Sequence, residues 1–392
     1  MTAELHEARL RPVRSSLLHS IKFKEETLSL LGRTFSFPSR RLFLAGAVFA
    51  LTLTLAGLVG TSRAAGDVNI LETGSSLVYP LFNLWVPDYT KTHSDMKITT
   101  QSTGSGTGIS QASEGLAQIG TSDAYMADAL LKQHPDMLNI PLCISSQMVN
   151  YNVPQLNSSH LKLSGPVLAA IYQGKVTKWN DPQIVALNKG VALPDHAIIP
   201  VHRSDGSGDT FIFTQYLAFS TPDWANSLSY STTISWPAIS GELGAQGNQG
   251  MITAVQGNPY SIAYIGTSYM DTIDKDSLGT AMLQNKDGKF VLPTPKTAAA
   301  AASVMVPKTP ADERVSLIFA PGPDSYPIIN YEYAIVNSKQ SAGDMATALR
   351  DFLTWAISPS GGNSSKYLAQ VHFSPLPASV VKLSSAQIAK IQ

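Results

Sequence analysis

The alternation of strand-like and helix-like segments in residues 68–123 constrains the fold of this chain more than any other feature of its sequence. Three runs have the pattern of β-strands: 68–71, 97–101 and 118–123. The first two are each followed by a polar loop and then by the start of a helix-like segment. Such alternation indicates an α/β domain with a mostly parallel sheet. Ligands bind such sheets at the carboxyl ends of strands, so we expect a site in the following loops: 73–79, 102–108 and 121–123.

Two long extended runs, at 145–154 and 326–336, enclose a central block that also alternates strands and helices. With 392 residues the chain is long enough for two domains. We therefore expect one domain inserted into another, with the chain crossing between them twice. Domain I would comprise residues 66–148 and 329–392, and domain II would comprise residues 149–328.

The central block contains the segment His-Arg-Ser-Asp-Gly-Ser-Gly-Asp-Thr-Phe at 202–211, which leads into a helix-like apolar run. Glycines before a helix leave backbone N–H groups free, and together with the helix dipole they can bind a small anion. Arg203 could add a planar, permanently charged fork for an oxyanion. The alternative is a surface turn capped by aspartate or serine.

Charge is unevenly distributed along the chain. The 28 basic residues balance the 28 acidic ones, but residues 1–64 hold nine of the basic and only four of the acidic residues. Residues 65–392 therefore carry 19 basic and 24 acidic residues, a net charge of −5. This balance argues against a nucleic-acid partner, which needs a basic face. An anion must be bound by local geometry and not by bulk charge.

The N-terminal 64 residues have the layout of a signal peptide with a long n-region. Arg40-Arg41 precedes an apolar stretch that ends in small residues, with cleavage expected after Ala64. The pattern Ser-Arg-Arg-x-Phe-Leu at 39–44 also resembles the twin-arginine export signature. The alternative is an uncleaved membrane anchor, because the apolar stretch is just long enough to span a bilayer. Either way, we expect a periplasmic or extracellular protein.

Several kinds of chemistry find no support in the sequence. It contains no Gly-Lys-Ser/Thr phosphate loop and no Gly-x-Ser-x-Gly nucleophile elbow. The histidines after residue 64 lack metal-ligand spacing. The single cysteine, Cys143, lies in an apolar run and is expected to be buried. We therefore predict no metal, no cofactor and no enzymatic activity.

The chain resembles the phosphate-specific substrate-binding proteins of bacterial ABC transporters over about residues 68–385. Its most specific motif is Arg-Ser-Asp-Gly-Ser-Gly at 203–208. The other matching motifs are Thr-Gly-Ser-Ser at 73–76 with Tyr-Pro at 79–80, Gly-Ser-Gly at 104–106, Gly-Thr-Ser-Asp at 120–123, Ile-Tyr-Gln-Gly-Lys at 171–175, Trp-Asn-Asp at 179–181 and Phe-Ser-Pro-Leu-Pro at 373–377.

The resemblance implies a type II periplasmic-binding-protein fold, in which two α/β domains joined by two extended hinge strands close around a ligand cleft. It also implies a set of phosphate-binding residues, with Asp205 orienting Arg203 behind them. The implied ligand-binding residues are Ser76, Val78, Tyr79, Ser105, Asp123, Arg203, Ser207, Gly208 and Asp209. Val78 and Asp209 stand where family members often have threonine. With Val78 the site lacks the side-chain donor that a threonine would supply. The carboxylate of Asp209 could act as a second acceptor beside Asp123.

Asp123 would select phosphate over sulfate. Phosphate has a second pKa of about 6–7 and still carries a proton near neutrality, which a buried carboxylate can accept. Sulfate offers no proton and would meet an unpaired, repelling charge. The alternative for Asp123 is a turn or cap at a strand end.

The resemblance implies an exported monomeric receptor that captures inorganic phosphate and delivers it to ABC transporter permease subunits in the inner membrane. The alternatives are the same fold binding another oxyanion, or a secreted phosphatase or other hydrolase.

Overall fold

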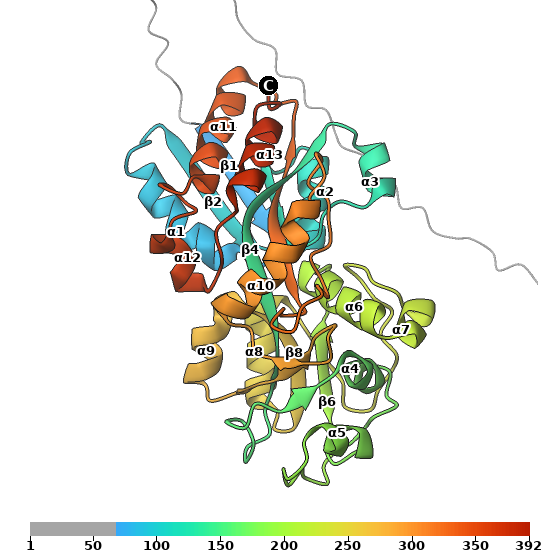
Figure 1. The fold of residues 1–392 in the computed structure, drawn as a ribbon. Helices are drawn as coiled ribbons and strands as arrows, with labels where there is room; N and C mark the ends of the chain where they lie inside the picture. Colours follow the sequence, from blue (N-terminus) through green and yellow to red (C-terminus); the bar gives the residue numbers. More distant parts are fainter. Residues whose placement is uncertain (1–67) are drawn as a thin grey trace, which may run out of the picture. The chain divides into compact units, whose positions relative to one another are not determined.

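The computed structural model of the chain describes residues 68–392 (Figure 1). The predicted signal peptide, its cleavage after Ala64 and the alternative membrane anchor all lie outside these residues. Among the helices of residues 68–392, we find none with the length and apolar character needed to cross a bilayer.

One sheet runs through the described part of the chain, in the strand order β2-β1-β3-β12-β4-β8-β6-β7, with β9 paired to β4. Its strands are β1 (Val68–Gly74), β2 (Met96–Ser102), β3 (Ile119–Ser122), β4 (Met137–Tyr151), β6 (Ile199–Arg203), β7 (Leu243–Ala245), β8 (Ser261–Gly266), β9 (Gly279–Thr280) and β12 (Ile329–Asn337). A small second sheet has the order β11-β10-β5, from β5 (Lys162–Leu163), β10 (Met282–Gln284) and β11 (Phe290–Val291).

The sheet is parallel at its two ends and antiparallel in its middle. β1 pairs in parallel with β2 and β3, and β6 pairs in parallel with β7 and β8. β12 runs antiparallel to both β3 and β4, and β4 runs antiparallel to β8. The prediction of parallel strands is therefore confirmed for the βα units, whereas the long connecting strands give the sheet a mixed character.

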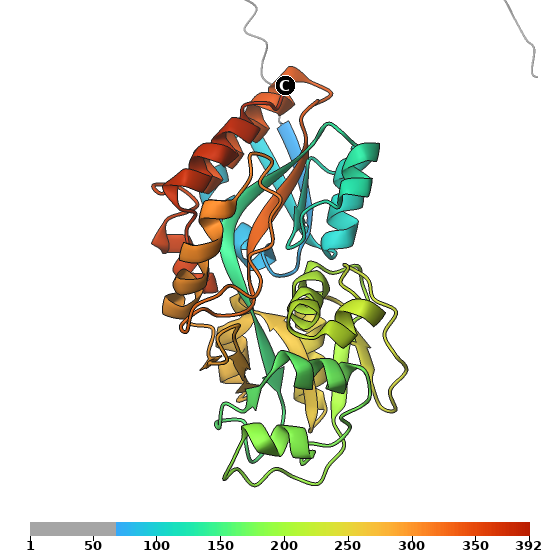
Figure 2. The same cartoon turned by 45° about the vertical axis from the view of Figure 1, so that its right-hand side comes forward.

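Helices cover the sheet in two groups (Figures 1 and 2). Around the end with β1 and β2 lie α1 (Tyr79–Thr90), α2 (Ser105–Ser113), α3 (Asp128–Gln133), α10 (Pro295–Met305), α11 (Gly343–Ile357), α12 (Ser365–Leu368) and α13 (Ala378–Ile388). Around the end with β6 and β8 lie α4 (Gly165–Tyr172), α5 (Pro182–Leu187), α6 (Gly208–Ser220), α7 (Pro222–Ser227), α8 (Gly247–Gly257) and α9 (Met270–Lys275). Short 3-10 turns occupy Thr267–Tyr269, Val306–Lys308 and Ala369–Val371.

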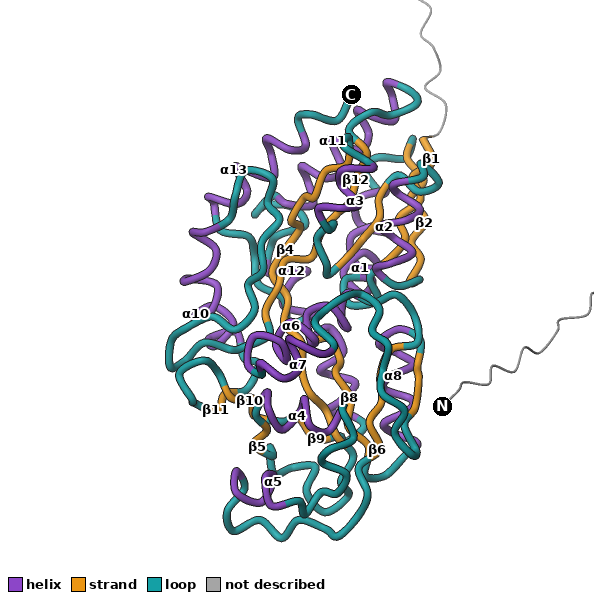
Figure 3. Tube along the Cα trace, turned by 90° about the vertical axis from the view of Figure 1, so that its right-hand side faces the viewer, coloured by secondary structure: helices purple, strands orange, loops and turns teal. Residues whose placement is uncertain are grey.

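The strand β4 belongs to both groups of elements, as the tube in Figure 3 makes visible. Its first half pairs with β12 and its second half pairs with β8, and all 15 of its residues are buried. It begins at Met137, eight residues before the extended run expected from the sequence. Pro141 obscured this start, and it is tolerated because the β4–β12 register shifts at that point. Cys143, in the same strand, is buried and free, as predicted.

The segment 102–108 differs from the expectation of a loop, because α2 begins at Ser105 and includes two of its glycines. Glycine is a poor helix former, but here packing outweighs propensity. A Cβ atom on Gly108 would lie 2.7 Å from the carbonyl oxygens of Thr73 and Thr121, so only glycine lets α2 lie this close to β1 and β3. This contact brings the start of α2 to the carboxyl ends of both strands.

Candidate functional site

The N-termini of four helices, α1, α2, α6 and α8, meet at the carboxyl ends of the strands. The N–H of Gly106, in the first turn of α2, donates to the carbonyl of Gly206, just before α6, at 2.8 Å. The N–H of Asn248, in the first turn of α8, donates to Ser76 Oγ at 3.0 Å, in the loop that leads into α1. Helix N-termini present unpaired N–H groups and a positive dipole end. Their convergence creates an anion-binding environment.

Arg203, the last residue of β6, is held between two aspartates. Its Nε donates to Asp205 Oδ1 at 2.7 Å, and its Nη1 donates to Asp209 Oδ2 at 2.7 Å. Its Nη2 also pairs with Asp205. The side chain is only 1% exposed, so the two carboxylates balance a buried charge. Asp205 therefore lies where it can fix the orientation of the Arg203 guanidinium.

The carboxylate of Asp209 accepts hydrogen bonds at both oxygens. Gln147 Nε2 donates to Oδ1 at 3.0 Å, while Asn248 Nδ2 and Arg203 Nη1 each donate to Oδ2 at 2.7 Å. Burial raises the pKa of Asp209 to about 7, the charge of Asp123 adds to this rise, and Arg203 opposes it. The carboxylate is thus engaged by the protein on both sides.

Asp123 follows β3 and is 2% exposed. Ser75 Oγ donates to its Oδ1, and Ser105 Oγ donates to its Oδ2 at 3.4 Å. Burial raises its pKa well above the usual range, and the neighbouring carboxylate of Glu332 raises it further. Asp123 therefore favours its protonated form in this arrangement.

Of the residues predicted in the first loop, Ser76 joins the site through its hydroxyl, which accepts from Asn248 Nδ2 at 2.9 Å. The N–H groups of Val78 and Tyr79 bond within the loop, to Ser75 Oγ and to the Ser75 carbonyl, both at 3.2 Å. Both N–H groups lie at the N-terminus of α1 and are bonded to Ser75.

The start of α6 is built for close approach. Ser207 caps the helix by accepting the N–H of Thr210 at 3.2 Å, which leaves the N–H groups of Gly208 and Asp209 without a partner inside the helix. A Cβ atom on Gly208 would lie 2.5 Å from Asp123 Oδ2 and 2.6 Å from Ser105 Oγ. Glycine at this position therefore brings α2, α6 and the end of β3 together.

The structure adds residues that the sequence reasoning missed. Ser75, Gln147, Asn248 and Glu332 all contact the predicted set. Glu332 could have been noticed in the sequence, because it is the one carboxylic acid within the expected strand 326–336, and a charged residue is rarely buried without a partner. Asn248 and Gln147 left no such signal, since a polar amide in a glycine-rich loop or a long strand is ordinary.

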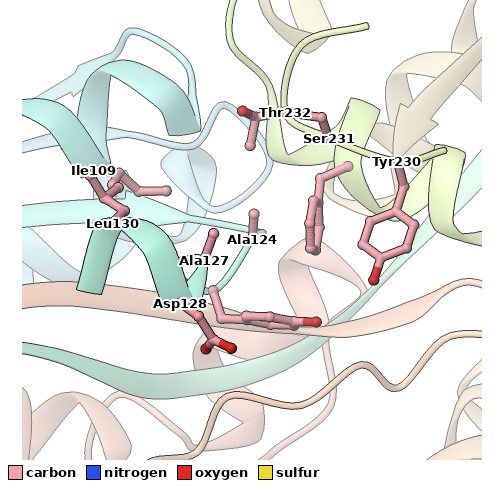
Figure 4. A pocket seen from close by; sticks show the side chains of 10 residues that line it. Ile109, Ala124, Ala127, Asp128, Leu130, Tyr230, Ser231 and Thr232 are labelled. Atoms are coloured by element: carbon pink, nitrogen blue, oxygen red, sulfur yellow. The ribbon is translucent and has the colours of Figure 1, made fainter. Parts of the chain in front are cut away.

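A pocket of about 390 Å³ lies beside the site (Figure 4). The carbonyl of Thr232, in its wall, accepts the N–H of Ser207 at 2.8 Å. Tyr125 and Phe211 meet edge to face across it, with ring centroids 5.4 Å apart. The pocket is lined by Ile109, Ala124, Tyr125, Ala127, Asp128, Leu130, Phe211, Tyr230, Ser231 and Thr232. The nine predicted ligand-binding residues lie outside this lining.

Comparison with known proteins agrees with this geometry. A model of the PBP superfamily domain matches residues 59–360. The chain is 33% identical over 356 residues to the phosphate-binding protein PstS of Methanocaldococcus jannaschii, covering 84% of this chain and 90% of that protein. It is 35% identical over 319 residues to the phosphate-binding protein PstS of Pasteurella multocida, covering 81% and 89% respectively.

A solved high-affinity periplasmic phosphate-binding protein, bound with phosphate, matches with a TM-score of 0.64 at 19% identity, over 83% of this chain and 93% of that chain. This likeness confirms the type II periplasmic-binding-protein fold expected from the sequence. The sequence matches establish that the chain belongs to the PstS family of phosphate-binding proteins, within the PBP superfamily.

Proposed function

We propose that this protein captures inorganic phosphate and delivers it to an ABC transporter. The observation that carries the proposal is the convergence of helix N-termini on the buried carboxyl group of Asp123. Free N–H groups at the start of α6 would donate to phosphate oxygens, and Asp123 would accept the proton that phosphate carries. The relatives named for phosphate binding support the same ligand.

The proposed ligand-binding residues are those that the family resemblance implies, and the contacts around them support the following roles. The N–H groups of Gly208 and Asp209 and the hydroxyl of Ser105 would donate directly. Arg203 already has two carboxylate partners, so its charge is largely balanced before an anion arrives. The binding energy would therefore come mainly from aligned backbone dipoles and hydroxyl groups.

We also propose that the site lies between two domains, 66–148 with 329–392 and 149–328, which close around the ligand; α10 belongs to the second range but lies with the helices of the first domain (Figure 1). The proposed hinge is where β4 passes from β12 to β8, next to the entry into β12. At this point the N–H of Gln147 donates to the carbonyl of Ile328 at 3.1 Å. The side chain of Gln147 reaches Asp209, which would couple the hinge to the site.

In this proposal the protein is exported by its N-terminal signal, works outside the cytoplasm as a monomer and docks on permease subunits in the inner membrane. Replacing Arg40-Arg41 with lysines tests the export route, because the twin-arginine pathway reads both arginines. We expect the precursor to remain inside the cell, and the exported parent protein to begin at Ala65 or Gly66. Normal export of the variant would indicate a general signal peptide, and retention of residues 42–60 would indicate an anchor.

Titration calorimetry of residues 65–392 tests the binding function. We expect phosphate and arsenate to bind, because both carry a proton near neutral pH, and sulfate to be rejected. Sulfate binding as tight as that of phosphate would favour the alternative of another oxyanion. Turnover of a phosphate monoester by the same sample, with no tight binding of phosphate, would favour the hydrolase alternative.

A further inference from the structure

The carboxyl groups of Asp123 and Glu332 meet in the interior of the protein at the hydroxyl of Ser75, which donates to Asp123 Oδ1 and lies 3.5 Å from Glu332 Oε2. Glu332 is the fourth residue of β12, is 0% exposed and comes from an element that none of the predicted ligand motifs includes. Two buried carboxyl groups this close repel each other strongly when both are charged. The pair therefore holds one proton in this arrangement.

The surrounding donors decide which carboxyl group carries this proton. Glu332 Oε1 accepts from Ser145 Oγ at 2.6 Å and from Asn330 Nδ2 at 3.1 Å, and these bonds favour its charged form. Burial and the neighbouring charge of Glu332 raise the pKa of Asp123, whereas the contact with Asp123 lowers the pKa of Glu332. Asp123 thus carries the proton and Glu332 the negative charge.

The two oxygens of Asp123 face different surroundings. Oδ1 accepts from Ser75, whose hydroxyl also lies 3.5 Å from Glu332 Oε2. Oδ2 lies on the side of Ser105 and of the first residue of α6, Gly208. Asp123 can therefore keep its contact with Glu332 through the side of Oδ1 while Oδ2 faces a ligand.

Other charged and titratable groups act on the pair from the neighbouring elements. Asp209 of α6 raises the pKa of Glu332, after the larger effect of burial and against its hydrogen bonds. Arg203 of β6 lowers the pKa of Asp123 but is itself paired with Asp205 and Asp209. Cys143 of β4 lies opposite Glu332 in the β4–β12 ladder, and its buried thiol stays protonated.

We propose that Glu332 is a positioning residue for Asp123, holding a shared proton that lets the pair present one negative charge, and not two, to bound phosphate. Above the pH at which the free pair loses this proton, phosphate binding then draws a proton from the solvent, because a second charge would repel the anion. The inference rests on the proposed function for its ligand, although the shared proton itself is independent of ligand.

The first experiment needs no ligand. Protein labelled with ¹³C at the aspartate carboxyl carbon is titrated between pH 5 and 9 while the infrared band of protonated aspartate is recorded. Loss of the band in Asp123→Asn assigns it to Asp123. We expect Glu332→Gln to move the midpoint of this band to lower pH by about one unit or more. The reason is that a neutral amide at position 332 no longer repels the ionised form of Asp123.

Glu313→Gln is the matched control. Glu313 is also fully buried and also has a raised pKa, but its carboxyl group bonds to Ser384 and not to Asp123. Its removal should leave the midpoint of the Asp123 band unchanged. Circular dichroism checks the fold of each variant. If Glu332→Gln does not fold, Glu332→Asp retracts the carboxylate by one methylene and should move the midpoint in the same direction. An unchanged midpoint, or an equal shift in Glu313→Gln, overturns the proposal.

The second experiment counts protons. Calorimetric titration with phosphate at pH 8, in buffers of different ionisation enthalpy, gives the number of protons taken up per phosphate bound. We expect Glu332→Gln to take up fewer protons per phosphate than the parent protein, with a difference of up to about one proton. The phosphate affinity of the parent should therefore fall more steeply between pH 7 and 8 than that of the variant, by a factor of up to about ten. Equal uptake in both proteins overturns the coupling to phosphate. A parent protein that binds no phosphate refutes the proposed function instead, and the infrared titration then decides alone whether the pair shares a proton.

Discussion

At the scale of single residues, Asp123 carries the choice of ligand. Asp123→Asn replaces a group that only accepts on the ligand side with an amide that can also donate there, so charged phosphate loses an acceptor for its proton, whereas sulfate gains a donor. Loss of such a charge-assisted hydrogen bond costs roughly 1.5–3 kcal/mol, or about ten- to a hundredfold in affinity. We expect calorimetry to show weaker phosphate binding and measurable sulfate binding. Sulfate exclusion that survives this change would place selectivity elsewhere.

A variant of Asp209 can show whether a nearby negative charge weakens anion binding by repulsion alone, without direct contact with the anion. Both of its oxygens are engaged by Arg203, Gln147 and Asn248, so its influence on the ligand would be electrostatic. Its pKa of about 7 means that it gains charge as the pH rises from 6 to 8. We expect Asp209→Thr to reduce the loss of phosphate affinity over this range and to free one face of Arg203. An unchanged ratio of Kd values at pH 6 and 8 would show that this carboxylate has no influence on the ligand.

The residues that sequence reasoning located are those that lie in contiguous motifs. Arg203, Asp205 and Ser207 belong to one loop, and their geometry follows from a strand, a turn and a helix start. Ser75 and Asn248 act through contacts between residues up to 257 positions apart, which no local pattern encodes. Glu332 is intermediate, since its charge in an apolar strand is visible in the sequence but its partner is not.

At the scale of elements, the site depends on how closely the starts of α2 and α6 approach. Gly208→Ala places a methyl group 2.5 Å from Asp123 Oδ2 and 2.6 Å from Ser105 Oγ, with no free space to accept it. We expect the variant to fold, because the clash is local, but to lose at least about tenfold in phosphate affinity. Gly343→Ala, in the first turn of α11, is the control, since its Cβ meets nothing within 4 Å. Equal affinity in the two variants would mean that the helix starts do not form the site.

The sequence also predicted most of the elements that carry the site, because β1, β2 and β6 have the strand period and are followed by polar turns. It missed the extent of α2 and the start of β4, where packing outweighs local preference. In both cases the determining contact lies in a partner strand.

At the scale of the whole molecule, the proposed function requires the two domains to move. The connections are few, since β4 and the segment entering β12 link the two halves of the large sheet. Two-domain binding proteins close around their ligand by hinge motion. We expect the radius of gyration measured by X-ray scattering to fall when phosphate is added to residues 65–392. A protein that binds phosphate in calorimetry without any such change would not have a hinge.

The interior of residues 68–392 is rich in acids and poor in bases. Its fully buried ionisable acids are Glu72, Asp123, Asp209, Glu313 and Glu332, whereas Arg203 is the buried base of this part of the chain. Burial raises the pKa of Glu72 and Glu313 to about 8, of Asp209 to about 7 and of Glu332 to about 6. Near neutral pH, folding therefore keeps protons on groups that the unfolded chain would release.

This imbalance gives the ligand-free protein a stability that depends on pH in a defined direction. A carboxyl group with a raised folded-state pKa contributes stability fully below its unfolded pKa, near 4, and loses it as the pH rises through the folded value. The relevant window is thus from about pH 5 to 8. The half-buried Asp88 and the exposed Asp128 have lowered pKa values, so their contribution to stability is lost only as the pH falls toward acid values outside this window.

We expect the Tm of ligand-free residues 65–392 to fall by roughly 5–10 °C between pH 5 and 8, which corresponds to a few kcal/mol for a chain of this size. Glu72→Gln should flatten this fall, because it removes a carboxyl group whose Oε2 has no hydrogen-bond partner and whose ionisation folding opposes. Glu114→Gln, at an exposed position, is the control and should leave the slope unchanged. Calorimetric scans at pH 5, 6.5 and 8 measure the effect. A Tm that rises across this range would mean that the buried acids are already ionised in the folded protein.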